Sequence, residues 1–363
     1  MASSCDIISR ILRYALWGDE SMLNRALFES LSVEEWYDVH TLALRQGVVA
    51  IMLDGIIKAD IPISRAAKMR FISSTDKLEK GYALRAALAD KLAETYHSAG
   101  IEMMILKGIG LSQLYPVPQH RPCSDIDIYL MGKQREGDEL LRQKYGIKIN
   151  EGHHHHTIFH LKGILVENHY DFIEAHSRRS KARLEEYLKE LSATEQPIKA
   201  RLSNEEYLQP APNLNALFLT LHAADHFAAE NISIRHITDW AMFLRRYHSE
   251  VDWQRLYNLA QEFGFKMFLD VLNSMCVIYI GMPKEYAPST TCNTALVERA
   301  WNDCLQYKLT HIPKNFIRGW AYRMRRRYRN GWKRRMVTCE GAISTLFYSA
   351  LSHIIHPNVF RKG

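Results

Sequence analysis

The run Ser124-Asp125-Ile126-Asp127-Ile128-Tyr129-Leu130 decides the fold of this chain. Its alternation at period two predicts a β-strand that carries both carboxylates on one face, while Ile126 and Ile128 point into a core. Two acids held so close repel each other unless a cation neutralises them. Divalent cations such as Mg²⁺ or Mn²⁺ suit carboxylate oxygens, and two such ions can clamp the phosphates of a nucleotide. Asp-x-Asp on its own also occurs at solvated strand edges and turns, so the neighbouring sequence has to support the site.

The segment before this strand predicts a phosphate-binding turn. Residues 101–106 are typical of a short buried strand, Lys107-Gly108 interrupts it, and apolar residues return at helical spacing over 109–114. A glycine lets the backbone approach an anion, the start of a helix offers free N–H groups, and Lys107 adds positive charge. The alternative is a glycine that merely ends a strand.

These residues together resemble a known family. Leu106-Lys107-Gly108, Tyr115-Pro116, Arg121 and Asp125-Ile126-Asp127 are similar to the bacterial family of uncharacterised minimal nucleotidyltransferases, within the DNA polymerase beta-like superfamily. The superfamily has Gly-Gly or Gly-Ser at the turn and a shorter spacing to the acids. The Lys-Gly form fits the narrower family. The resemblance implies that Lys107 and Gly108 receive the phosphates, and that Arg121 either binds phosphate or braces the acid strand.

A third carboxylate, which the superfamily places on a neighbouring strand, has a candidate in the segment Ile164 to Asp171. The family pattern of hydrophobic, acidic, hydrophobic, His, aromatic is matched by Glu167, His169 and Tyr170, while Asn168 departs from it. On an extended strand, Glu167, His169 and Asp171 share a face. We therefore expect Glu167 to be the third metal ligand, with Asp171 in reserve, and His169 to orient the acids.

Two groups of histidines suggest metal sites but do not have the spacing of known motifs. His153 to His156 are consecutive, and adjacent side chains on an extended segment point in opposite directions, so a polar strand or loop is the preferred interpretation for most of them. The alternative is that one or two of them approach phosphate or substrate. His222 and His226 share a helical face, but the Glu of a metalloprotease helix is missing. The resemblance implies that this helix packs against the catalytic core or lines the substrate cleft.

Length and composition indicate a globular protein. The 363 residues are 47% hydrophobic and 24% charged, and no stretch has the ~20 apolar residues of a transmembrane helix. No signal peptide is visible, because Asp6 and Arg10 interrupt the apolar residues near the N-terminus. The six cysteines show no paired pattern. We expect a cytoplasmic protein.

The chain divides into three predicted parts, which together give an α+β fold with excess helix. Residues 1–98 form an N-terminal helical region, 99–200 a nucleotidyltransferase core with a small mixed β-sheet, and 201–363 a C-terminal helical region. From Ser203 onward the pattern predicts helices. In the core, 133–145 and 178–191 predict helices, and 146–150 and 157–160 predict short strands.

The positive charge is concentrated in one place. Ten Lys or Arg residues lie between Lys314 and Arg335, interleaved with five aromatic residues, in a chain of net charge +7. Such a segment can bind an anionic partner, either nucleic acid or a membrane surface. The alternative is a solvated basic helix whose aromatic residues pack inward.

The leading hypothesis is a metal-dependent nucleotidyltransferase that moves a nucleoside monophosphate from ATP or another NTP to an acceptor hydroxyl, with release of pyrophosphate. Asp125 and Asp127 hold both metals in this hypothesis, and Glu167 completes the site. The competing hypothesis is a non-catalytic nucleotide sensor, or a module that binds nucleic acid through the basic segment. The residues do not specify the NTP or the acceptor, which can be a small molecule, a protein or an RNA.

Overall fold

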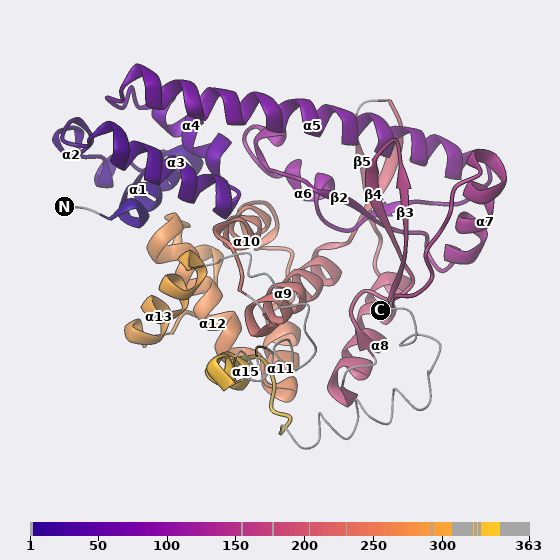
Figure 1. The fold of residues 1–363 in the computed structure, drawn as a ribbon. Helices are drawn as coiled ribbons and strands as arrows, with labels where there is room; N and C mark the ends of the chain where they lie inside the picture. Colours follow the sequence, from indigo (N-terminus) through magenta and orange to yellow (C-terminus); the bar gives the residue numbers. More distant parts are fainter. Residues whose placement is uncertain are drawn as a thin grey trace. The chain divides into compact units, whose positions relative to one another are not determined.

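The computed structural model describes residues 3–153, 155–175, 178–202, 204–229, 231–291, 293–306, 322, 325 and 328–341. The described residues form two compact units (Figure 1). Among the described residues, unit 1 is drawn from the ranges 3–77 and 220–339, and unit 2 from 78–219 and 340–341. The N-terminal helices and the helices after residue 219 therefore belong to one unit, although some 140 residues separate them in the chain.

Unit 2 is built on a six-stranded mixed sheet in the order β3-β4-β2-β1-β6-β5. The strands are β1 (Met104–Ile105), β2 (Asp125–Tyr129), β3 (His156–Leu161), β4 (Ile164–His169), β5 (Ile198–Arg201) and β6 (Glu206–Gln209). β2 pairs with β4, and β1 with β6, in parallel, whereas the other three pairings are antiparallel. The predicted α+β class with a mixed sheet flanked by helices is confirmed.

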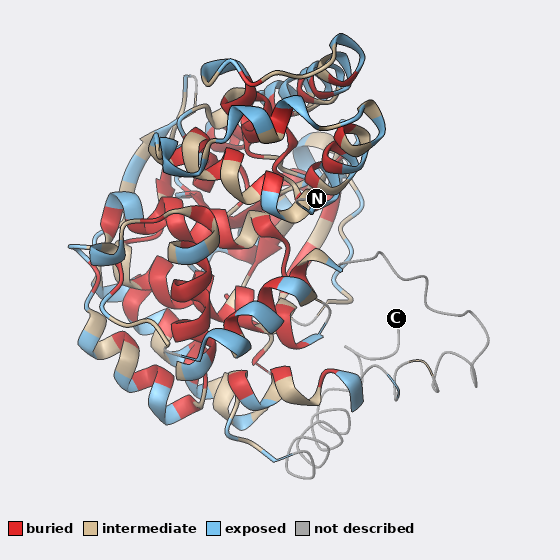
Figure 2. Ribbon diagram, turned by 90° about the vertical axis from the view of Figure 1, so that its left-hand side faces the viewer, coloured by how far each residue is buried: buried red, intermediate tan, exposed pale blue. Residues whose placement is uncertain are grey.

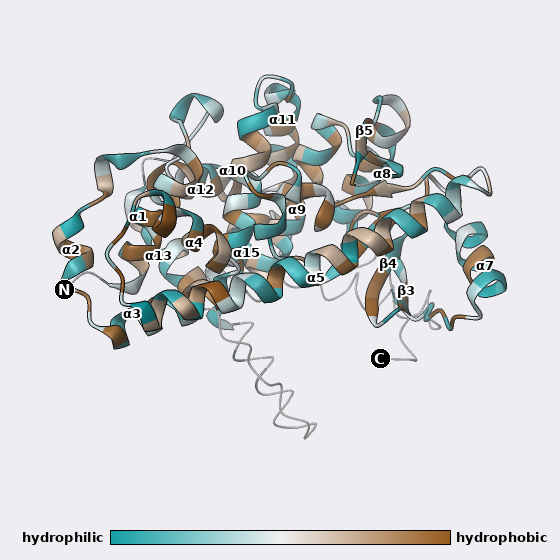
Figure 3. Cartoon of the chain, turned by 90° about the horizontal axis from the view of Figure 1, so that it is seen from above, coloured by the Kyte–Doolittle hydropathy of each residue, from teal (hydrophilic) through white to brown (hydrophobic). Residues whose placement is uncertain are grey.

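The helices of unit 2 follow the predicted pattern closely. They are α6 (Ile109–Ser112), the 3₁₀ turn η2 (Pro118–His120), α7 (Gln134–Tyr145) and α8 (Arg179–Thr194). Two further helices, α5 (Arg65–His97) and α9 (Pro212–Ala229), continue from one unit into the other. Hydrophobic and hydrophilic residues alternate around α5 and α7, as helices with one buried face require (Figure 3).

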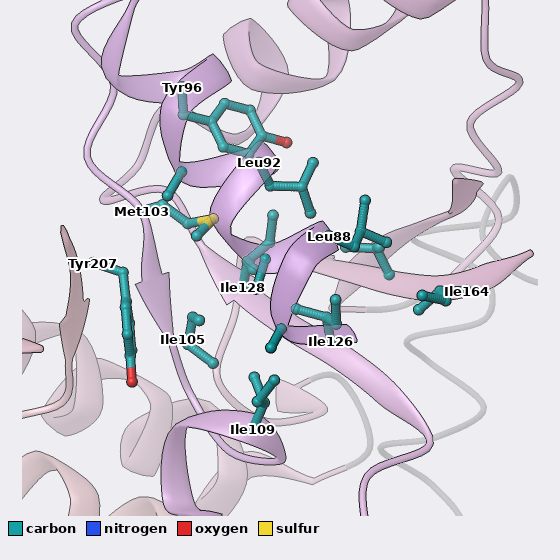
Figure 4. Packing of buried hydrophobic residues seen from close by; sticks show 14 of the residues in the cluster. Leu88, Leu92, Tyr96, Met103, Ile105, Ile109, Ile126, Ile128, Ile164 and Tyr207 are labelled. Atoms are coloured by element: carbon teal, nitrogen blue, oxygen red, sulfur yellow. The ribbon is translucent and has the colours of Figure 1, made fainter. Parts of the chain in front are cut away.

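The core of unit 2 lies between the second half of α5 and the central strands (Figure 4). Leu92 and Tyr96 of α5 pack in one cluster with Ile105, Ile126 and Ile128 of β1 and β2, and none of these five side chains is exposed. Each buried side chain of this size contributes ~2 kcal/mol relative to an exposed one. The packing fixes which face of β2 points to the core, and therefore which face carries its acids.

Two predictions about the strands were wrong. Residues 206–209, expected to be helical, form β6, in which Leu208 lies opposite Met104 and its N–H donates to the Met103 carbonyl at 2.9 Å. This short strand pairs along its whole length with the antiparallel strand β5 and at Leu208 with β1, and such pairing is not visible in the local sequence pattern. Of the strand predicted over 146–150, only Asn150 pairs, through an isolated bridge to Ile158.

Unit 1 is helical in its described residues. Its elements are α1 (Ser4–Trp17), η1 (Glu20–Met22), α2 (Arg25–Glu29), α3 (Val33–Gln46), α4 (Val49–Lys58), α10 (Ile234–Tyr247), α11 (Trp253–Phe263), α12 (Lys266–Met275), the π-helical η4 (Cys276–Ile280), η5 (Lys284–Tyr286), α13 (Thr294–Leu305) and α15 (Gly331–Val337). Local signals set the ends of α1: Ser3 and Asp6 form a capping box, and Gly18 ends the helix at φ 71°. Buried and exposed positions alternate along the helices (Figure 2).

Buried polar contacts tie the early and late helices of unit 1 together. The Gln46 side chain, which is fully buried at the end of α3, accepts from the Ile234 N–H at 2.9 Å and donates to the Cys304 carbonyl at 3.0 Å. It thereby fixes the start of α10. The Trp240 indole donates to the Asn273 side chain at 2.8 Å.

Most of the basic segment predicted as a docking arm, 314–335, lies outside the described residues. Within its described part, Lys333 is almost fully buried and forms an ion pair with Asp303 of α13. This lysine therefore anchors α15 inside unit 1. No helix among the described residues has the length and apolar character needed to span a membrane.

Candidate active site

Two adjacent parallel strands place the second acid of the Asp-x-Asp pair beside the predicted third acid. Asp127 of β2 lies directly opposite Glu167 of β4 in the register. Ligand atoms of Asp127, Glu167 and His169 all lie within 4.8 Å of one another. Registered residues on neighbouring strands present their side chains to the same face, which explains why residues 40 positions apart converge.

Asp127 is the centre of this group. Its side chain is fully buried, and one oxygen, Oδ1, lies 3.1 Å from Lys107 Nζ and 3.1 Å from His169 Nε2. Burial opposes ionisation, but the Lys107 charge and the His169 hydrogen bond outweigh it and lower the pKa of Asp127 well below its usual value. Asp127 is therefore a carboxylate at neutral pH. Its other oxygen, Oδ2, is buried and has no hydrogen-bond partner among the described residues.

The Lys107-Gly108 turn packs directly against this strand. Gly108 has φ 60° and ψ −117°, and a Cβ there would lie 3.4 Å from the Asp125 carbonyl and 4.0 Å from Asp127 Oδ2. The turn thus needs a glycine for its backbone conformation, whereas a Cβ would make only ordinary van der Waals contacts with Asp125 and Asp127. Burial lowers the pKa of Lys107, but the charges of Asp127, Asp125 and Glu167 outweigh it, and the pKa rises. The lysine accordingly stays charged.

The helix after this turn is shorter than the sequence predicts. α6 spans only Ile109–Ser112, against the expected 109–114. A helix of one turn offers little dipole at its N-terminus. Positive charge at the turn therefore comes mainly from the Lys107 ammonium group.

Asp125 and Arg121 lie at the edge of the group. Asp125 begins β2, is partly exposed and accepts a hydrogen bond from the Ser124 hydroxyl at 3.0 Å. By strand alternation it shares the face of Asp127, but it is not a member of the close cluster of Asp127, Glu167 and His169. Arg121 is buried, and its guanidinium donates to the Pro122 carbonyl at 3.0 Å, in the loop that leads into β2.

His169 links the two acids. Its Nε2 lies 3.6 Å from Glu167 Oε2 besides its hydrogen bond to Asp127. Burial lowers the pKa of His169, but hydrogen bonds to Asp127 and Glu167 outweigh it and raise the pKa. The ring can therefore carry a proton and neutralise part of the negative charge of the acids, in keeping with the orienting role expected from the sequence.

Two of the four consecutive histidines, His155 and His156, lie beside the acids, an alternative that the sequence left open for one or two of them. Ligand atoms of His155, His156 and His169 lie within 4.8 Å of one another, and His156 Nδ1 is 4.0 Å from Glu167 Oε2. Strand alternation does not separate the two neighbours because β3 begins at His156, while His155 lies in the bend before it. Burial, and then nearby positive groups, lower the pKa of His155 to about 2. Burial also lowers that of His156, to about 4, although Glu167 opposes the shift.

Asp171, the reserve ligand, lies elsewhere. β4 ends at His169, so the alternation that would align Asp171 with Glu167 does not reach it. Its carboxylate instead forms an ion pair with Lys189 of α8. The expectation that Glu167, His169 and Asp171 share one strand face was therefore wrong for Asp171.

Comparison with known proteins gives one family. The model of a family described as "Uncharacterised nucleotidyltransferase" matches residues 32–281, which include all six strands and every residue of the site. No curated protein and no solved structure shows significant similarity to the chain.

Proposed function

Because the chain belongs to the uncharacterised nucleotidyltransferase family, we propose that it transfers a nucleoside monophosphate from an NTP to an acceptor hydroxyl, with release of pyrophosphate and in dependence on a divalent metal. The observation that carries this proposal is the register of Asp127 opposite Glu167, with a buried Asp127 oxygen that has no partner among the described residues. The sequence alone suggested the same chemistry through the Asp-x-Asp strand.

The donor atoms fit a hard divalent cation. Asp127 Oδ2 is buried without a hydrogen bond, and Glu167 offers a second carboxylate within 4.8 Å. Mg²⁺ and Mn²⁺ prefer such oxygen ligands. Asp127 and Glu167 would hold one ion, and the partly exposed Asp125 would share a second with Asp127. Bound there, the metal supplies charge neutralisation for the phosphates and acidifies the acceptor hydroxyl.

The protein groups around the acids position the reactants and balance charge. Lys107 holds Asp127 Oδ1 and brings a positive charge to the turn where Gly108 leaves the backbone accessible to phosphate. His169 fixes the orientation of Asp127 from the other side. Phosphoryl transfer depends mostly on such positioning and electrostatic stabilisation, so few residue types suffice.

One observation favours a second candidate, a nucleotide sensor without turnover. Lys107 and His169 already neutralise Asp127 without any metal. A site that is balanced in this way can bind a nucleotide phosphate through Lys107 and remain inert. The nucleotidyltransferase would release pyrophosphate, whereas the sensor would bind the nucleotide without releasing it.

The test measures pyrophosphate release by the full-length protein from ATP, CTP, GTP and UTP, with Mg²⁺ or Mn²⁺, in the presence of small-molecule, protein and RNA acceptors. Asp127→Asn and Glu167→Gln should each lower turnover at least ~100-fold, because each removes a charged metal ligand. Glu186→Gln, at an exposed acid on α8, is the matched control and should retain activity.

Calorimetry separates the two candidates. NTP binding that depends on Mg²⁺ but leads to no pyrophosphate release with any acceptor class would favour the sensor. Full pyrophosphate release by Asp127→Asn would exclude this site as the catalytic centre.

A further inference from the structure

The structure brings three histidines together in unit 1, on elements that carry none of the acids discussed above. His222 and His226 lie on α9, and His236 lies in the first turn of α10. Nitrogen atoms of the three rings all lie within 4.8 Å of one another. From the sequence, only the first two could be recognised as neighbours, because they are four residues apart on one helix.

The ring geometry is that of groups converging on a point. Ring centroids are 4.6 Å apart for His222 and His226, 5.3 Å for His226 and His236, and 6.0 Å for His222 and His236. In a tetrahedral zinc site with Zn–N bonds of about 2.0 Å, ligand nitrogens are roughly 3.3 Å apart. The three nitrogens, which lie within 4.8 Å of one another, would have to move closer together by small changes in the side-chain torsions when an ion binds. All three residues are at least partly exposed, so an ion can reach them.

A hydroxyl group is in place to orient the third ring. The Ser233 side chain lies 3.0 Å from His236 Nδ1, and the Ser233 N–H donates to the same nitrogen at 3.1 Å as part of the capping box of α10. Histidines that bind a metal through Nε2 normally present Nδ1–H to an acceptor. Binding through Nε2 therefore requires His236 Nδ1 to carry the proton and donate it to the Ser233 hydroxyl, in place of the hydrogen bond that Nδ1 accepts from the Ser233 N–H in this structure.

We propose that His222, His226 and His236 form a site for Zn²⁺ or a similar transition-metal ion, with three imidazole ligands and a fourth position for water. Three neutral nitrogens suit Zn²⁺, Ni²⁺ or Co²⁺ and suit Mg²⁺ poorly, whereas the carboxylates of Asp127 and Glu167 have the opposite preference. The two sites therefore differ in metal class. The ion joins the end of α9 to the start of α10 and stabilises unit 1 by mass action.

The test uses Co²⁺ as a spectroscopic probe in the metal-free full-length protein. The wild type should bind Co²⁺ with the visible absorption of a low-coordinate nitrogen site, and Zn²⁺ should displace it. His222→Gln, His226→Gln and His236→Gln should each weaken binding at least ~100-fold, since loss of even an orienting partner of a ligand costs 10- to 100-fold. His236→Gln keeps a glutamine at the capping-box position, which preserves the helix start.

His248→Gln is the matched control. His248 lies at the end of the same helix α10, where its ring stacks on Tyr286, away from the three-histidine cluster. This variant should bind Co²⁺ like the wild type. Zn²⁺ should also raise the unfolding midpoint of the wild type and of His248→Gln, but not that of His236→Gln.

Other outcomes overturn the proposal. Absence of Co²⁺ binding in the wild type would do so, as would wild-type affinity in all three cluster variants. A Co²⁺ signal that survives in His236→Gln but disappears in His155→Gln would assign the metal to the histidines of unit 2 instead.

Discussion

The ion pair between Lys107 and Asp127 allows a sharp test of the electrostatics of the site. We consider Asp127→Asn and Lys107→Met, which remove each charge at nearly constant shape, and their double mutant. The two charged atoms are 3.1 Å apart, with Asp127 fully buried and the Lys107 side chain 19% exposed. In metal-free buffer each single variant leaves the other charge poorly compensated, so both should be less stable than the wild type.

The magnitude follows from distance and burial. At an effective dielectric constant of 20, two charges 3.1 Å apart attract by about 5 kcal/mol. Three features reduce the measured loss: the partial exposure of Lys107, the hydrogen bond from His169 to Asp127, and the nearby charge of Asp125. We expect each single variant to lose about 3 kcal/mol of unfolding free energy, with a coupling energy of about 2 to 3 kcal/mol.

The assay is urea unfolding of the four proteins at pH 8 with a chelator, analysed as a double-mutant cycle. Lys91 and Glu94 provide the control cycle: their charges are closer, at 2.7 Å, but both side chains are about half exposed. Their coupling should be much the smaller of the two, because solvent screens exposed pairs. Equal coupling in the two cycles, or none for Lys107 and Asp127, would refute the argument that burial makes this pair strong.

Three further predictions concern other parts of the chain. Burial raises the pKa of Glu185 to about 7 although two backbone N–H groups donate to its carboxylate. The folded Glu185 carboxyl therefore binds more protons than the unfolded one between pH ~4.5 and 7, so its own contribution to stability falls by about 3 kcal/mol as pH rises through that window, while His155 and His156 contribute in the opposite direction. Glu185→Gln should remove this dependence in urea unfolding at pH 5 and 8, and an unchanged pH profile would contradict the shift. Gly108→Ala should cost about 2 kcal/mol in the same assay, because φ 60° with ψ −117° is strained for a residue with a Cβ; a loss below ~0.5 kcal/mol would show that the turn relaxes without strain. Gln46→Leu leaves the buried Ile234 N–H without its hydrogen-bond acceptor and should lower the free energy of unfolding by about 2 kcal/mol. A loss below ~0.5 kcal/mol would rule out that contact as the anchor of α10.

Local patterns predicted much of the catalytic half of the fold. Period-two alternation located β2, and helical spacing located α7 and α8 to within a few residues at their ends. The prediction failed at β6, where four residues without a clear pattern form a strand because they pair with β5 on one side and with β1 on the other. The predicted position of Asp171 was wrong for a related reason: β4, which would have carried it, ends two residues earlier.

The candidate site was also predicted in part. Lys107, Asp127, Glu167 and His169 converge as the motif and its spacing suggested. The sequence left open that one or two of the consecutive histidines approach the site, but not which ones, because adjacent side chains diverge only within a strand and the start of β3 could not be placed from the sequence. The burial of Asp127 and its pairing with Lys107 and His169 came to light only in the structure.

The sequence by itself determined which side chains share a face and where helices begin and end, because those properties depend on backbone geometry over a few residues. It placed Asp125 and Asp127 on one side of a strand, the glycine turn ahead of them, and the capping box at Ser3. Only the tertiary structure decided that β4 lies in register beside β2, and that His236 meets the two histidines of α9. Such contacts depend on how distant segments pack. The free energy of that packing is a sum over the whole core, so it cannot be read from the local sequence around the residues in contact.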